Sequence, residues 1–153
     1  MITSTSLLIQ RAGLSEKDAA RVFKTDRATI RKWLSGEVET PDGVTKELWS
    51  IIDLQQHAPN YVLTLVHRFQ PDGEIRICVS DNEYMSQIQG WPAAATMNGA
   101  VRRFLEMADD ATRARTRVIY CLEPPGADTY IFGVRLRPDG SFDEVDDPPE
   151  ADG

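Results

Sequence analysis

The spacing of apolar residues changes after about residue 56. From residue 5 to that point they recur at helical intervals, and beyond residue 61 segments appear in which they alternate with polar residues, as in strands. The change falls at His57-Ala58-Pro59-Asn60. We therefore predict a helical domain at 1–58 and a mixed domain at 59–142, followed by a tail at 143–153, and an α+β fold class overall.

Two short helices joined by a tight turn are predicted near the start of the chain. Ser15 is followed three residues later by Asp18, a capping pattern that predicts a helix beginning there. Asp26 caps a second helix that ends at about Leu34, before Ser35-Gly36. Two helices with this connection predict a helix-turn-helix. The side chains expected to form its core are Ala20, Phe23, Ile30 and Trp33.

The residues from Leu14 to Gly36 resemble the xenobiotic-response-element, or lambda-repressor-like, helix-turn-helix family. The likeness lies in Leu14-Ser15, an amphipathic helix, a four-residue turn, Thr29-Ile30, and then Trp33 and Gly36. A further helix is expected with Thr40 as its cap, Pro41 at its first helical position and Asp42 in its first turn. Its apolar positions are Val44, Leu48, Ile51 and Ile52. The resemblance covers residues 5–56 and implies a DNA-binding transcriptional regulator. Small regulators of this kind often repress their own operon in toxin–antitoxin modules or phages, which makes an autorepressor of a phage or mobile element the expectation.

The second helix of the pair should enter the major groove of DNA, because that is how a helix-turn-helix docks. Its outward residues Arg27, Ala28 and Arg31 are the predicted base readers, since arginine can donate two hydrogen bonds to guanine and alanine can contact a thymine methyl group. The predicted phosphate contacts are Lys17, Thr25, Thr29 and Lys32. A dimer would then read an inverted repeat with half-sites about one helical turn apart.

The charge distribution supports a local DNA contact and excludes a general one. The chain has 17 Lys and Arg against 24 Asp and Glu, a net charge of −7 that is unsuited to coating nucleic acid through a basic surface. Residues 1–58 hold eight basic and eight acidic side chains, so the excess acid lies in residues 59–153. Within the neutral half, Lys24, Arg27, Arg31 and Lys32 fall in a stretch of nine residues whose single acidic residue is Asp26.

The second domain is predicted as ββαββ. Strands at Tyr61–His67 and Glu74–Ser80 flank a turn at residues 70–73, and strands at Arg117–Glu123 and Thr129–Arg137 flank residues 124–128. Between these hairpins a helix opens at Trp91-Pro92 and ends near Asp109-Asp110. The apolar face of that helix is Met97, Val101, Phe104, Leu105 and Ala108, and one face of the last strand is Tyr130, Phe132, Val134 and Leu136.

The role expected for this second domain is homodimerisation, because pairing a sheet edge across a two-fold axis protects that edge. Ligand sensing through its arginines (Arg102, Arg103, Arg113, Arg115 and Arg117) is a weaker alternative, since such charges are usually solvated. An alternative for the whole protein is an antitoxin-like or anti-defence module whose C-terminal domain binds a partner protein. The acidic tail should be disordered, and it either solubilises the chain or competes with DNA.

Other functional classes have little support in the residues. No GxSxG, HExxH, GxGxxG or GxxxxGK[ST] motif occurs, so we expect no catalytic residue, no metal site and no cofactor. Cys78 and Cys121 are expected to be reduced core thiols, and His57 and His67 to be structural. No apolar run approaches the ~18 residues of a membrane span and no signal peptide is evident, so we expect a cytoplasmic protein.

Overall fold

The structure of the chain is a computed structural model, which describes residues 2–81, 83, 91–121, 129–130, 132, 135–136 and 142–143. It combines helices with a small three-stranded parallel sheet, behind an N-terminal helical region, so the α+β class is consistent with it. The helices are α1 (Ser4–Ala12), α2 (Glu16–Val22), α3 (Arg27–Ser35), α4 (Asp42–Phe69), α6 (Ala94–Met107) and α7 (Asp110–Ala114). The strands are β1 (Ile75–Val79), β2 (Thr116–Tyr120), β3 (Thr129–Tyr130), β4 (Arg135–Leu136) and β5 (Phe142–Asp143).

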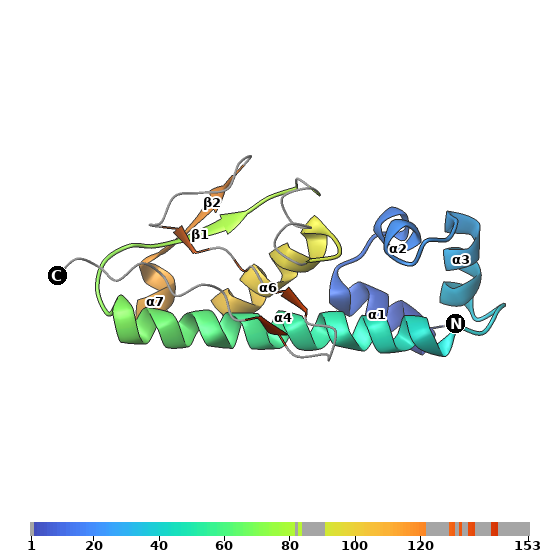
Figure 1. The fold of residues 1–153 in the computed structure, drawn as a ribbon, viewed down its shortest axis with the longest axis horizontal. Coiled ribbons are helices and arrows are strands. Elements are labelled where there is room, and N and C mark those ends of the chain that lie inside the picture. Colours follow the sequence, from blue (N-terminus) through green and yellow to red (C-terminus); the bar gives the residue numbers. More distant parts are fainter. Residues whose placement is uncertain are drawn as a thin grey trace.

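The long helix α4 runs the length of the molecule (Figure 1). Over its first half lie α1, α2 and α3, and over its second half lie α6, α7 and the sheet. The prediction of a strand at Tyr61–His67, and of a hairpin with Glu74–Ser80, was therefore wrong, because those residues form the last turns of α4. The domain boundary predicted after residue 58 falls inside this helix rather than in a linker.

The error at 61–67 has a physical cause. The run Tyr-Val-Leu-Thr-Leu-Val is rich in residues that favour strands, and Pro59 suggested a break because an interior proline costs a helix about 3 kcal/mol. Val62, Leu65 and Val66, however, lie on the same buried face as Leu54 and Ala58. Packing this face against α6 and β1 outweighs both local preferences.

The helix-turn-helix elements follow their predicted caps. Ser15 accepts from the backbone N–H of Asp18 at 3.0 Å, and Asp26 accepts from that of Thr29 at 2.7 Å. Gly13 and Gly36 end α1 and α3 in the left-handed conformation that glycine adopts without strain. Pro41 takes the cap position before α4, one residue later than the cap predicted at Thr40, whose hydroxyl instead hydrogen-bonds that of Thr5.

The sheet is parallel, in the order β2-β1-β3, and this corrects the predicted second hairpin. Cys78 of β1 lies opposite Ile119 of β2, and Ile77 lies opposite Tyr130 of β3. The chain therefore crosses from β1 to β2 through α6 and α7, as parallel pairing requires, instead of folding into two hairpins. The turn-like residues 124–128, on which the hairpin was based, lie outside the described residues.

The end of the predicted second domain also differs from expectation. Instead of one strand over 129–137, the described residues include β3 and the separate β4, which pairs antiparallel with β5. Asp143 was assigned to a disordered tail but pairs with Arg135 in that ladder. Residues 144–153 of the predicted tail lie outside the described residues, as does Val134.

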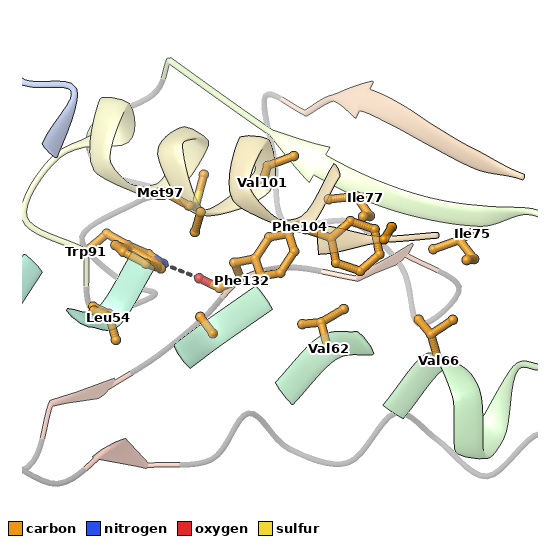
Figure 2. Close-up of a cluster of buried hydrophobic side chains, with 13 residues drawn as sticks. Leu54, Val62, Val66, Ile75, Ile77, Trp91, Met97, Val101, Phe104 and Phe132 are labelled. Atoms are coloured by element: carbon orange, nitrogen blue, oxygen red, sulfur yellow. Dashed lines mark hydrogen bonds between the residues drawn. The ribbon is translucent and has the colours of Figure 1, made fainter. Parts of the chain in front are cut away.

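The larger core fills the space between α4, α6 and the sheet (Figure 2). The predicted inward face of α6 is confirmed, because Met97, Val101, Phe104 and Ala108 are buried and Leu105 packs against them. The rings of Phe104 and Phe132 lie 5.8 Å apart, and the indole N–H of Trp91 donates to the Phe132 carbonyl oxygen. A second core, around Ile9, Ile30 and Leu48, joins α1, α2 and α3 to the first half of α4.

Candidate nucleic-acid interface

The outer face of α3 is formed by side chains that are exposed to solvent. Arg27 and Arg31 are 58% and 62% exposed, and Ala28 and Lys32 are also exposed. Because Ile30 and Trp33 on the opposite face are buried, the amphipathic pattern predicted for this helix is confirmed. The helix therefore presents two arginines and a small apolar side chain on one solvent-facing surface.

The position of α3 is fixed by its inward residues and by the turn before it. Ile30 and Ala20 are buried, and the rings of Phe23 and Trp33 meet edge to face with centroids 6.5 Å apart, so all four predicted core residues pack as expected. In the turn, Lys24 has φ = 54°, and Thr25 donates its backbone N–H to the Ala20 carbonyl oxygen at 2.9 Å. This bond closes the end of α2, and Lys24 occupies the left-handed position that is usually taken by glycine.

An acidic residue of α2 contacts both exposed arginines of α3. The Nε of Arg31 donates to Oε2 of Glu16 at 2.9 Å, and an Nη of Arg27 lies 3.6 Å from the same oxygen. Glu16 is 34% exposed, so these ion pairs are open to solvent. The carboxylate offsets part of the positive charge at the predicted base-reading surface, and it orients the Arg31 guanidinium.

The predicted phosphate-contacting residues lie on α2, on α3 and in the turn between them. Lys17 is exposed in the first turn of α2, Lys32 is exposed on α3, and Thr25 and Thr29 are half-buried in the turn and at the start of α3. Hydrogen bonds from Thr29 to the cap Asp26 lower the pKa of that carboxyl below its ordinary value. Asp26 therefore stays ionised at neutral pH and caps α3 beside these basic residues.

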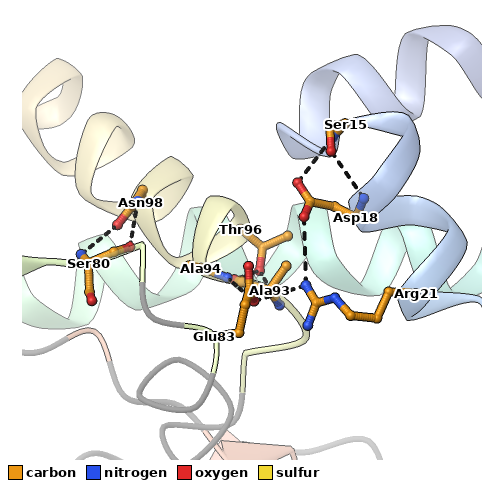
Figure 3. Close-up of polar contacts among 9 residues, drawn as sticks. All are labelled: Ser15, Asp18, Arg21, Ser80, Glu83, Ala93, Ala94, Thr96 and Asn98. Carbon is orange, nitrogen blue, oxygen red and sulfur yellow. Dashed lines mark hydrogen bonds and ion pairs between the residues drawn. The ribbon is translucent and has the colours of Figure 1, made fainter. Parts of the chain in front are cut away.

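Polar contacts connect this interface to the C-terminal half (Figure 3). Arg21 of α2 pairs with Glu83 at 2.9 Å, and Glu83 also accepts from the backbone N–H of Ala94, in the first turn of α6. Deeper in the junction, the fully buried Gln55 of α4 donates from Nε2 to two carbonyl oxygens, of Ala12 at 2.9 Å and of Thr96 at 3.1 Å. Helices α1 and α2 are thus joined to the C-terminal half by an ion pair and by specific hydrogen bonds.

The arginines considered for ligand sensing include two that bond backbone carbonyls instead. Arg113 donates to the carbonyl oxygens of Leu105 and Ala108 at the end of α6. Arg115 donates to those of Gln70 and Gly73 after α4. Both arginines satisfy carbonyl groups at or beyond the C-terminal ends of helices, which is a structural task.

The cysteines and histidines do not assemble into a reactive centre in the described part of the chain. Cys78 and Cys121 are free thiols, and burial, with a smaller contribution from Cys121, raises the pKa of Cys78 to about 12. A thiol so protonated is a poor nucleophile at neutral pH. Within the described ranges, no three His, Cys, Asp or Glu side chains are grouped to hold a metal ion, and no helix is long and apolar enough to cross a membrane.

The contacts that sequence reasoning missed are long-range ones. Glu16 lies 11 and 15 residues before its two arginine partners, and Gln55 lies more than 40 residues from each carbonyl that it bonds. No local pattern encodes such pairs, although the polar Gln55 within the apolar stripe of α4 was a signal that could have been read.

A scan against models of protein families found no match to this chain, and a search of curated proteins found no similar sequence.

Proposed function

We propose that the protein is a sequence-specific DNA-binding transcriptional regulator that reads the major groove through α3. The observation that supports this most is the outward exposure of Arg27, Ala28 and Arg31 on a helix held by buried Ile30 and Trp33. In a helix-turn-helix that binds DNA, the first helix and the turn contact phosphates. In this chain α2 and the turn at 23–26 precede α3 and are the corresponding elements. Binding needs only this locally basic surface, so the net charge of −7 is no obstacle.

The proposal includes a homodimer that binds an inverted-repeat operator and represses by occupying a promoter. One unit of this size contacts too little DNA for tight specific binding, whereas two units can span half-sites about one helical turn apart. The strand β2 offers a surface for the second copy, because it is at the edge of the three-stranded sheet and exposes Val118 (42%) and Tyr120 (55%).

Selection from a random duplex DNA library tests the DNA claim. The enriched sequence is titrated at two salt concentrations with the wild type and with the double variant Arg27→Ala, Arg31→Ala. We expect an inverted repeat to be enriched, and we expect sequence preference to be lost in the double variant. The matched control is Arg68→Ala, Arg102→Ala, which removes the same charge from exposed positions in the C-terminal half, outside β2. If no sequence is enriched, a pull-down for a protein partner tests the antitoxin-like alternative.

The dimer claim is tested separately by light scattering of the purified chain. We expect the wild type to have twice the monomer mass and Val118→Lys to dissociate it, because a charge at a buried apolar contact carries a desolvation cost. A wild type that is monomeric at micromolar concentration contradicts this part of the proposal without affecting the DNA claim.

A further inference from the structure

We infer that Glu16 is a specificity-determining residue of the DNA interface. It positions Arg31 for a base contact, and it weakens the sequence-independent part of DNA binding. This inference rests on the proposed function. It assigns a role in selectivity to an acidic side chain that, taken alone, opposes DNA binding.

The first observation is the atom through which Arg31 is held. Arg31 donates to Glu16 through Nε at 2.9 Å. A guanidinium has five N–H donors in a rigid plane, and its two terminal nitrogens are the pair that can donate to O6 and N7 of guanine. A carboxylate bonded at Nε fixes the plane of the group without using that terminal pair. Glu16 therefore reduces the entropy that a 62%-exposed arginine loses when it binds a base.

The second observation is the shared oxygen. Oε2 of Glu16 lies 2.9 Å from Arg31 Nε and 3.6 Å from Arg27 Nη2, so one negative charge serves the two predicted base readers. The Glu16 carboxylate thus competes with DNA phosphates for both arginines.

These two effects act on different quantities. Competition with phosphate lowers affinity for every sequence, whereas orientation of Arg31 favours only a site with guanine at the contacted position. Their combination raises the ratio of specific to non-specific affinity, which decides occupancy when most available DNA is non-specific. A neutral residue at position 16 that can still accept a hydrogen bond should separate the two effects.

The experiment uses three duplexes: the sequence selected with wild-type protein, the same sequence with the contacted guanine replaced, and a random sequence. Glu16→Gln keeps an oxygen for Arg31 Nε and removes the charge. We expect it to bind all three duplexes more tightly, with a salt dependence steeper by about one unit of slope, while its preference for guanine stays within about threefold of wild type. Glu16→Ala should show the same steeper slope but lose about tenfold of that preference.

The matched control is Asp53→Asn, which removes one negative charge from an exposed position on α4 and should change neither the slope nor the preference. Thermal unfolding of each variant establishes that it is folded. If Glu16→Ala keeps the wild-type preference, or if Glu16→Gln loses as much of it as Glu16→Ala does, the positioning role is wrong. If both variants keep the wild-type salt slope, the competition with phosphate is wrong. A wild type that selects no sequence overturns the proposed function, and this inference with it.

Discussion

The two halves of the molecule differ in the range of the contacts that define their helices and strands. In the N-terminal half, the caps at Thr3, Ser15 and Asp26 each bond a backbone N–H three residues away. In the C-terminal half, β1 pairs with strands that begin about 40 and 50 residues later, and α6 packs on a helix that ends before β1 begins. Substitutions at these caps should act mainly on single helices, whereas substitutions in the core of the second half should act on the whole fold. The following experiments test that contrast.

The largest effect is expected from Phe104→Ala. Phe104 is fully buried beside Phe132, and replacing it leaves a cavity that costs about 3–5 kcal/mol. Because α4 belongs to both cores, amide hydrogen exchange should speed up in α3 as well as in α6. Urea unfolding measures the loss of stability, and exchange measured residue by residue shows its extent. Unchanged protection in α3 would mean that the halves unfold independently.

The junction between the halves is tested by Gln55→Ala. This change removes the donor that two buried carbonyl groups share, those of Ala12 and Thr96, and should cost about 2–3 kcal/mol in urea unfolding. The control is Gln56→Ala, which alters the next, exposed residue and should cost less than about 0.5 kcal/mol. If the two substitutions lower the free energy of unfolding equally, the hydrogen bonds of Gln55 do not contribute to joining the halves.

The turn of the N-terminal half offers a substitution that should stabilise it. Lys24 has φ = 54°, a conformation that costs a residue with a Cβ roughly 1–2 kcal/mol, and glycine adopts it freely. After allowance for the greater freedom of glycine in the unfolded chain, Lys24→Gly should gain up to about 1 kcal/mol in thermal unfolding. Lys32→Gly, in the middle of α3, should instead lose about 1 kcal/mol. A loss of stability at position 24 would contradict this account of the turn.

The smallest effect is expected from pH and should be alike in both halves. Asp26 and Asp109 each accept a backbone N–H at 2.7 Å, and these hydrogen bonds lower the pKa of both carboxyls. A carboxyl whose pKa is lower in the folded state adds stability above its unfolded value of about 3.9, and that stability is lost as pH falls through the folded pKa. Asp26→Asn and Asp109→Asn keep a capping oxygen without titrating, so each should flatten the loss of stability below about pH 4. If both variants lose stability below about pH 4 as the wild type does, these two caps are not the cause of that loss.

The sequence predicted most where chemistry is local. The capping residues Ser15 and Asp26 predicted where α2 and α3 begin, and the spacing of Ile30 and Trp33 identified the buried face of α3. Strand β1 and the apolar face of α6 were also found from their periods. The direction of strand pairing was missed, because an apolar alternation is the same in parallel and antiparallel sheets. The second half of α4 was missed because its helical state depends on α6, whose residues come 25 or more positions later.

The continuity of α4 also has a mechanical consequence. At 28 residues this helix is about 42 Å long, and one continuous helix therefore lies beneath both the sheet and the helices α1, α2 and α3. A tilt of about 5° at one end of a rod of that length moves the other end by about 4 Å. The helix is thus a lever, and a modest repacking around Val66 at its sheet end is geometrically sufficient to displace the three N-terminal helices by that distance.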